Sequence, residues 1–230
     1  MSVSAEKPLA VDTLLPMKLA LKVRFDTPIN IGGHGAPVFV DRPFRRDRDG
    51  WPFIPASSLR GRLRHECSRV LQSLGQPACN HVRADDLCRE AGSACAICAL
   101  FGAPWLRSRL RPEDLHLVRP PGLREEAPSS RVRYNVSLSR SRRVAEEARL
   151  FTTELFLPGI LLEFTGEWQA HLTLKDLALI EAGFGAMTAL GRGKTGGLGW
   201  CQIMLETEVK DAAQWRVLTE AERAAGRAAW

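Results

Sequence analysis

Residues 17–25, MKLALKVRF, alternate between large apolar side chains and lysine, alanine or arginine. The apolar positions that share one face are Met17, Leu19, Leu21, Val23 and Phe25. Successive side chains of an extended strand point to opposite faces, so this period of two predicts a strand that is buried on one side only. The fold should therefore contain a sheet with a second layer packed on one face.

Four further segments have a regular pattern. They are a helix from Ser57 to about Leu74, a half-buried strand over 162–168, a helix over 174–190 and a strand over 199–208. The apolar stripe expected on the first helix is Leu59, Leu63, Cys67, Val70, Leu71 and Leu74. The second helix has a start signal, Thr173 followed by Asp176. Strand–helix–strand occurs twice, which predicts an α+β fold: an antiparallel sheet with helices on one face, in the ferredoxin-like arrangement.

The segment 190–200, LGRGKTGGLGW, contains GKT, the end of a phosphate-binding P-loop. That motif requires a glycine five residues before its final Gly-Lys, where this chain has Thr188. A P-loop also follows a strand and opens a helix, whereas this loop follows a helix and precedes a strand. The segment therefore argues against a nucleotidase.

The chain is basic, with a net charge of +6 and 26 arginines against 6 lysines. Arginine forks onto phosphate and stacks on bases, so this bias favours nucleic acid or another polyanion as partner, although a GC-rich genome would also produce it. The first residues show no signal-peptide pattern and no apolar run reaches membrane-spanning length. We expect a cytoplasmic protein that has no membrane partner and no disulfides.

Four cysteines and a histidine fall close together in the sequence. Cys95 and Cys98 form a CxxC knuckle, which supplies half of a tetrahedral zinc site. Cys88 and either Cys79 or His81 would complete a closed, structural site. The alternative is a set of free thiols. The two other cysteines, Cys67 and Cys201, are expected in the core.

Asp41 lies in PVFVDRPFRR, an acid followed by arginines. A carboxylate there either holds a hard cation such as magnesium beside a substrate phosphate, or pairs with Arg42 or Arg45. Among the histidines, His34 in the segment GGHG is the one whose glycine-rich surroundings would let a substrate approach closely.

Three segments occur in the order typical of one family: FIPASSLRGRLRHE, CAICALFG and LGRGKTGGLGW. From about residue 17 to about 205, the chain resembles the RAMP superfamily of CRISPR-associated proteins. More narrowly, it resembles the Cas-seven-like backbone subunits of type III effector complexes. The resemblance implies a single RAMP domain over 1–230: an RRM-like palm, a zinc-binding insertion at 75–104 and a β-hairpin thumb at about 125–157.

The resemblance also implies roles for individual residues. Guide phosphates would be bound by Ser57, Ser58, Arg60, Arg64, Arg192 and Lys194. The thumb that enters the guide–target duplex would carry Arg131, Arg133, Arg140, Arg142 and Arg143. Asp41 falls where catalytic members place the aspartate that cleaves target RNA, a reaction that uses magnesium or manganese and the RNA's own 2′-hydroxyl. Here the motif reads VDRP where the family has IDSP or similar.

The expected partners are crRNA, complementary target RNA and neighbouring subunits of the complex. One tyrosine and no RNP1-like run predict RNA binding through the backbone, independent of sequence and sensitive to salt. Three alternatives are a non-catalytic guide-binding subunit, a metal-independent endoribonuclease that processes precursor RNA with His34 as base, and a zinc-stabilised protein-interaction domain that binds no RNA.

Overall fold

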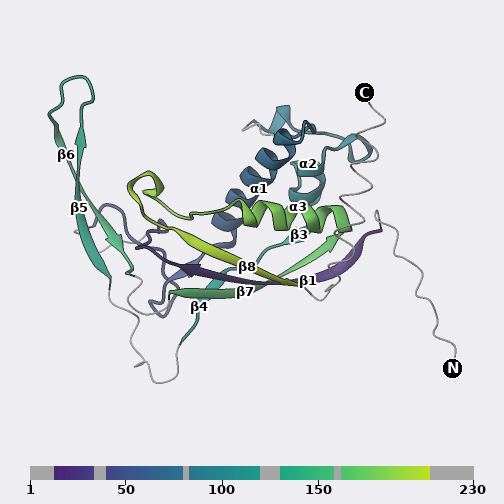
Figure 1. Ribbon diagram of the computed structural model, residues 1–230, viewed down its shortest axis with the longest axis horizontal. Coiled ribbons are helices and arrows are strands. Elements are labelled where there is room, and N and C mark those ends of the chain that lie inside the picture. Colours follow the sequence, from purple (N-terminus) through teal and green to yellow (C-terminus); the bar gives the residue numbers. More distant parts are fainter. Residues whose placement is uncertain (1–12, 34–39, 80–82, 120–129, 158–161, 208–230) are drawn as a thin grey trace.

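The computed structural model describes residues 13–33, 40–79, 83–119, 130–157 and 162–207. It has two parts: an antiparallel sheet with helices on one face, and a two-stranded hairpin that projects from the end of this sheet (Figure 1). The predicted α+β class is therefore confirmed. Within the described residues, no helix is long and apolar enough to cross a membrane.

The main sheet has six strands, all paired antiparallel. Their bounds are β1 Leu15–Phe25, β2 Phe53–Ile54, β3 Leu110–Arg111, β4 Leu115–Leu117, β7 Glu163–Leu172 and β8 Cys201–Thr207. The order is β2-β4-β7-β1-β8, and β3 pairs with β7 beside β4. The three strands predicted at 17–25, 162–168 and 199–208 are present as β1, β7 and β8, and the long β1 lies centrally between β7 and β8.

The helices α1, Ala56–Ser73, and α3, Leu174–Gly185, pack together over one face of the sheet, and the short α2, Ala96–Phe101, lies beside α1 (Figure 1). The apolar side chains of β1 are buried under this layer, as the alternation predicts. The opposite face of β1 and β7 is polar and carries exposed ion pairs, of which one joins Lys18 to Glu167 and another joins Lys22 to Glu163.

The helix ends differ from their predictions. The capping box of α3 is present, with Thr173 and Asp176 exchanging hydrogen bonds, but the helix ends at Gly185 rather than at 190. Residues after it turn back, and Ala189 forms a bridge with Trp200 just before β8. On α1 the predicted apolar stripe holds except at Leu74, which is 65% exposed because the helix ends one residue before it.

The predicted hairpin is also present, as β5, Arg131–Leu138, and β6, Ala145–Leu155. Its predicted start, 125–129, lies outside the described residues. Three single-turn 3-10 helices complete the described elements: η1 Ala84–Asp86, η2 Ala91–Ser93 and η3 Lys194–Gly196.

Candidate functional site

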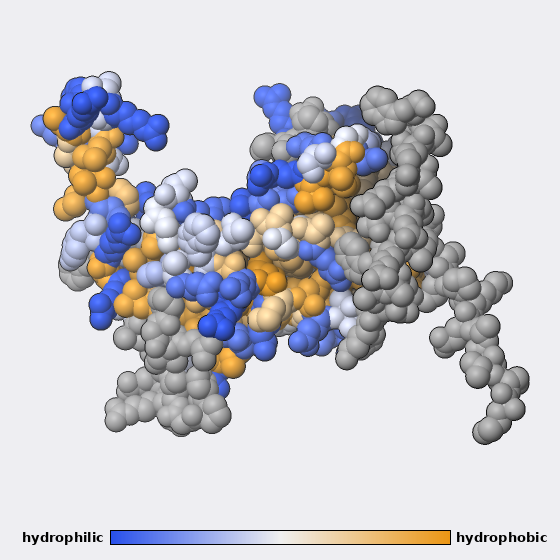
Figure 2. Space-filling view, in the orientation of Figure 1, coloured by the Kyte–Doolittle hydropathy of each residue, from blue (hydrophilic) through white to orange (hydrophobic). Residues whose placement is uncertain are grey.

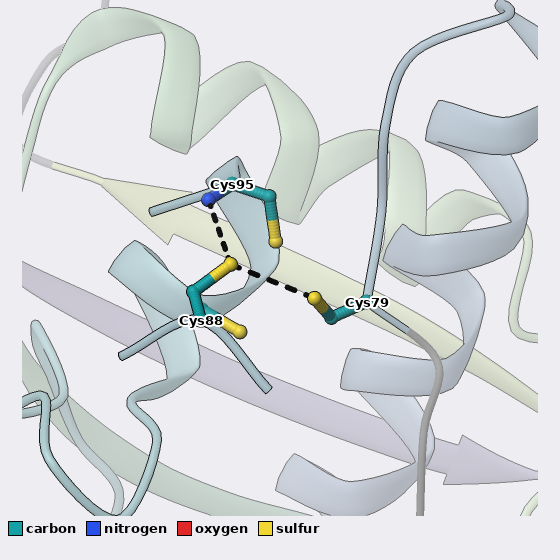
Figure 3. Close-up of side chains that lie close together, drawn as sticks. Cys79, Cys88 and Cys95 are labelled. Atoms are coloured by element: carbon teal, nitrogen blue, oxygen red, sulfur yellow. Dashed lines mark hydrogen bonds between the residues drawn. The ribbon is translucent and has the colours of Figure 1, made fainter. Parts of the chain in front are cut away.

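The four clustered cysteines converge on one point beside α2 (Figure 3). The sulfur atoms of Cys79, Cys88, Cys95 and Cys98 all lie within 4.8 Å of one another, and those of Cys79 and Cys88 are 3.6 Å apart. Zinc binds thiolate at about 2.3 Å, which places the sulfurs of a tetrahedral site about 3.8 Å apart. The arrangement therefore fits a four-thiolate zinc site that leaves no open position. The alternative ligand His81 lies outside the described residues.

The thiols of this cluster oppose one another's ionisation. Burial raises the pKa of Cys79 to about 12, and hydrogen bonds with the neighbouring thiols add to the rise. Burial acts in the same direction at Cys95, but hydrogen bonds from the backbone N–H groups of Cys98 and Cys79 outweigh it and bring this pKa to about 7. Without a cation, one thiol therefore ionises at the expense of another. A bound dication would let all four lose their protons.

The remaining cysteines are buried in the core, as expected. Cys67 lies under α3 and donates to the carbonyl of Leu179, and Cys201 opens β8. Burial raises the pKa of each of these two thiols to about 12.

Two arginines predicted to bind guide phosphates connect α1 to the end of α2. Arg60 donates to the carbonyl of Phe101, and Arg64 donates to that of Gly102 at 3.0 Å. These carbonyls are at the C-terminus of α2, where a helix attracts cations. The two family segments FIPASSLRGRLRHE and CAICALFG are therefore in direct contact, and both guanidinium groups have protein partners.

The start of α1 also has a partner within the chain. The backbone N–H of Ala56 donates to Oδ1 of Asp114 at 2.7 Å, and the next two residues, Ser57 and Ser58, have exposed side chains. The carboxylate of Asp114 thus accepts a hydrogen bond from the first N–H group of the helix, a position where the resemblance implies a guide phosphate. Gly61, one turn later, is exposed, and a Cβ added there would meet nothing within 4 Å.

The glycine-rich segment 190–200 packs against the loop that follows β1. A Cβ on Gly191 would lie 2.5 Å from the carbonyl oxygen of Asn30, and one on Gly32 would lie 2.8 Å from the guanidinium of Arg192. Gly191 and Gly32, one from each loop, thus allow the two loops to approach closely. Lys194 in this loop is half-buried, and its partial burial and the nearby Arg62 lower its pKa.

The β5–β6 hairpin carries its arginines in two places. Arg140, Arg142 and Arg143 form its exposed tip, and Arg131 and Arg133 line one face of the stem. The opposite face is apolar and exposed, which the arginine count did not reveal. Its members are Val132, Tyr134, Val136, Leu138 and Leu150. Figure 2 shows the hydrophilic tip above this hydrophobic stem.

Asp41 lies at the base of the hairpin. Its Oδ2 accepts hydrogen bonds from the backbone N–H and the hydroxyl of Thr152 on β6, at 2.7 and 2.9 Å. These bonds lower the pKa of the exposed Asp41 carboxyl. The guanidinium of Arg42, one of the two predicted partners, lies over the ring of Phe151, 3.8 Å from its centroid, and its charge adds to the lowering of the Asp41 pKa. Among the described residues, Oδ1 of Asp41 accepts no hydrogen bond.

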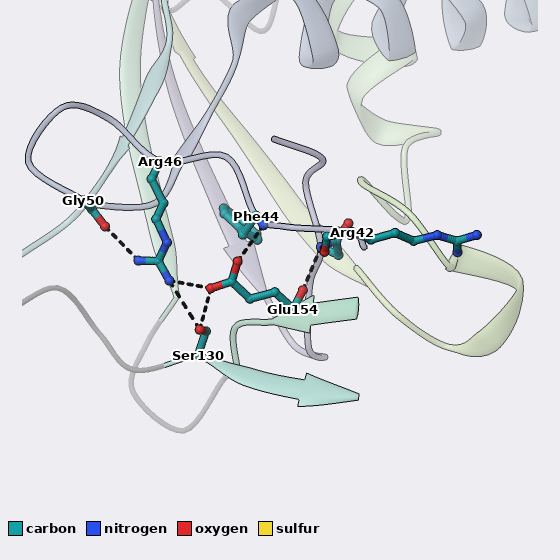
Figure 4. Close-up of polar contacts among 7 residues, drawn as sticks. Arg42, Phe44, Arg46, Gly50, Ser130 and Glu154 are labelled. Atoms are coloured by element: carbon teal, nitrogen blue, oxygen red, sulfur yellow. Dashed lines mark hydrogen bonds and ion pairs between the residues drawn. The ribbon is translucent and has the colours of Figure 1, made fainter. Parts of the chain in front are cut away.

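A buried carboxylate anchors the same region, and sequence reasoning missed it (Figure 4). Glu154 is 6% exposed and accepts from the backbone N–H of Phe44 at 2.7 Å, from Arg46 at 2.6 Å and from the hydroxyl of Ser130 at 2.5 Å. Asn30, fully buried, donates to the Glu154 carbonyl at 2.7 Å. An acid inside the apolar run LFTTELFL was the one available signal.

The predicted residues thus form separate groups. Asp41 joins the hairpin base, Arg60 and Arg64 join the cysteine helix, and Arg192 joins the loop after β1. His34 lies outside the described residues.

The comparisons with known proteins agree with this arrangement at the level of the family. A search of curated proteins finds no match to the chain. A family model described as the RAMP superfamily matches residues 22–202, a range that includes the end of β1, all of β7, the cysteine cluster, the hairpin and the glycine-rich loop. The chain therefore belongs to the RAMP superfamily.

Proposed function

We propose that this protein is a guide-RNA (crRNA)-binding backbone subunit of a type III CRISPR ribonucleoprotein effector complex. The observation that carries this proposal is membership of the RAMP superfamily over most of the chain, since RAMP proteins work with RNA and other CRISPR subunits. The partners are crRNA, a complementary target RNA and neighbouring subunits.

The topology supports the architecture that this function needs. With β2, α2, β3 and the hairpin set aside, the chain order is β1-α1-β4-β7-α3-β8, and the strands lie in the order β4-β7-β1-β8. This agrees with the β-α-β-β-α-β pattern of the proposed ferredoxin-like palm. In this proposal β5–β6 is the thumb, and residues 75–104 are an insertion that a structural zinc ion folds.

Guide binding in this proposal is directed to the RNA backbone. The exposed faces of β1 and β7 carry mainly charged and amide side chains, and their one aromatic ring is the imidazole of His171, so they lack the row of aromatic rings on which an RRM stacks bases. Phosphates would instead meet Lys194, the exposed start of α1 at Ser57 and Ser58, and the arginines of the hairpin. Arg60 and Arg64, which bind α2, would act by positioning α1.

We assign target cleavage to Asp41, with the help of magnesium or manganese. Its lowered pKa keeps the carboxylate ionised, and Oδ1 remains open to solvent among the described residues. Within that part of the chain, no group of three or more acids, histidines or cysteines other than the cysteine cluster is close enough to share an ion. An ion at Asp41 would therefore take most of its ligands from RNA phosphates and water, as magnesium commonly does. Such an ion would stabilise the charge that develops at the scissile phosphate.

The first experiment is purification of the protein with its nucleic acid, followed by sequencing of what copurifies. Repeat-derived guide RNA is expected, and protein free of RNA that also fails to bind guide RNA at low salt would overturn the proposal. The second adds complementary RNA and magnesium to the complex. Asp41→Asn, whose amide oxygen can still accept from Thr152, should abolish cleavage without loss of target binding.

A non-catalytic guide-binding subunit is the second candidate. The specific observation in its favour is that Asp41 already has a structural task, since it binds Thr152 through two hydrogen bonds. If Asp41→Asn still cleaves target RNA in the presence of magnesium, Asp41 is not the catalytic residue. Precursor processing at His34 would instead show as metal-independent cleavage that His34→Ala stops.

A further inference from the structure

An open pocket of about 340 Å³ lies at the edge of the sheet, beside the start of α1. It is lined by Arg46, Asp47, Arg48, Phe53, Asp114 and His116. Its volume is at the lower end of the range of ligand sites, roughly 300–1,000 Å³, so it suits one small flat group.

The pocket contains an aromatic platform. Phe53 on β2 and His116 on β4 are paired across the two strands, and their rings lie nearly parallel, with centroids 6.1 Å apart and planes 23° from each other. Their neighbours Ile54 and Leu115 are fully buried in the core. Because side chains alternate along a strand, Phe53 and His116 lie on the face away from the helices. Phe53 is buried, and His116 is exposed above it.

Three polar groups of the pocket have no hydrogen-bond or ion-pair partner among the described residues: the Arg48 guanidinium, the ring nitrogens of His116 and Oδ2 of Asp114. The other polar groups are occupied. Arg46 binds Glu154 and the carbonyl of Gly50, and Asp47 accepts from the backbone N–H groups of Asp49 and Trp51. The turn that carries Arg48 is thereby fixed in place. The pocket thus combines a preorganised frame with one cation, one carboxylate oxygen and one aromatic surface for a ligand.

We infer that this pocket binds a single unpaired base of single-stranded RNA. The base stacks on the His116 ring, Oδ2 of Asp114 accepts from an exocyclic amine on the base edge, and Arg48 pairs with a flanking phosphate. Aromatic stacking holds unpaired bases in many single-strand sites, and a carboxylate distinguishes bases that carry an amine from uracil. This inference rests on the proposed function in that the ligand is RNA. It departs from purely backbone-directed binding, because the identity of the base at one position of the RNA would affect affinity.

The test of the platform measures binding of fluorescently labelled oligoadenylate hexamers to the full chain by anisotropy. His116→Ala should weaken binding about tenfold, the typical effect of removing one stacked aromatic ring. His116→Phe should restore most of the affinity. His171→Ala is the matched control, since His171 is an exposed histidine on β7 of the same sheet face and should leave affinity unchanged.

The test of the base edge compares the adenosine hexamer with a hexamer of purine riboside, which lacks the exocyclic amine. Wild type should prefer the adenosine hexamer by about tenfold, as expected for a hydrogen bond to a charged acceptor. Asp114→Asn should remove this preference, since the amide can keep its oxygen on Ala56 N–H and presents a donor at the other position. A thermal melt of this variant checks that the fold is retained.

The two proposals fail in different ways. Wild-type protein that binds neither hexamer nor guide RNA at low salt would contradict the proposed function. The pocket inference alone would be overturned if the protein binds RNA tightly and with salt sensitivity, if His116→Ala leaves this affinity unchanged, and if the affinity does not depend on the exocyclic amine.

Discussion

Thr152 on β6 donates two hydrogen bonds to Oδ2 of Asp41, and its hydroxyl oxygen accepts a third from the Asp41 backbone N–H at 2.9 Å. The segment around Asp41 runs parallel to β6, and the isolated parallel bridge between Arg42 and Thr153 continues this contact. This pairing fixes the acid at the base of the hairpin. A displacement of the hairpin at Thr152 would therefore also displace Asp41.

Replacement of Thr152 by valine should raise the Asp41 pKa toward its ordinary value of 3.8, because the hydroxyl bond that favours the carboxylate is lost. The backbone N–H bond remains, so the rise should be partial. NMR titration of the Asp41 carboxyl carbon measures it. Thr152→Ser, which keeps the hydroxyl, should titrate like wild type, and an unchanged pKa in the valine variant would show that the hydroxyl does not act on Asp41.

Glu154→Gln should lower the free energy of unfolding at pH 7 by about 1–3 kcal/mol, because the carboxylate partner of Arg46 is lost at a buried position. Urea unfolding measures the loss. The matched control is Glu167→Gln, which removes the exposed partner of Lys18 and should cost less than about 1 kcal/mol. Equal losses in both variants would contradict the anchoring role of Glu154.

Wild type and Glu154→Gln should also differ in how their stability depends on pH. Burial acts to raise the pKa of Glu154, but hydrogen bonds from Phe44, Ser130 and Arg46 outweigh it and lower this pKa below its ordinary value of 4.5. A carboxyl whose pKa is lower in the folded than in the unfolded protein contributes its full stabilisation above the unfolded-state pKa. This contribution is lost as the pH falls through the folded-state pKa. The stability difference between wild type and Glu154→Gln should therefore shrink below about pH 4.5.

The features that could be predicted from the sequence are those set by local patterns. The period of two in β1, the capping box of α3 and the CxxC knuckle each depend on residues a few positions apart, and each is present. The end of α3 was predicted five residues too late, because apolar residues continue past Gly185 into the turn before β8.

The features that could not be predicted depend on contacts between distant segments. Asp41 and Thr152 are separated by 111 positions, so composition near Asp41 pointed to an arginine partner instead. Arg60 was expected to face RNA, but it reaches Phe101, 41 positions away. Phe53 and His116 become neighbours only when β2 pairs with β4.

A structural zinc ion should be present at about one per chain. Cys88→Ser should lower both the zinc content, measured by mass spectrometry, and the melting temperature, since the ion holds segments that lack a core of their own. Cys201→Ser is the control, because Cys201 lies outside the cluster and should leave the zinc content unchanged. Protein that contains no zinc and whose stability Cys88→Ser does not alter would favour free thiols.

Reactivity of the thiols provides an independent test of the same site. Cys67 and Cys201 should resist a thiol reagent in the folded protein, because burial raises their pKa to about 12. Chelation should make four further thiols reactive. Fast reaction of all six before chelation would contradict the zinc site.

The glycines of the segment 190–200 should separate into two classes. Gly199 has a φ of +75°, and a Cβ there would lie 2.0 Å from the Leu190 carbonyl oxygen, so Gly199→Ala should cost about 2 kcal/mol of stability. Gly196 has open space around its Cβ position, so Gly196→Ala should change stability by less than about 0.5 kcal/mol.

If RNA phosphate approaches this loop as proposed, Gly196→Ala should nevertheless weaken RNA binding several-fold. The neighbouring Lys194→Ala should reduce the slope of log affinity against log salt by about one. Full RNA affinity in both Gly196→Ala and Lys194→Ala would place the guide elsewhere on the protein and leave this loop with a packing role alone.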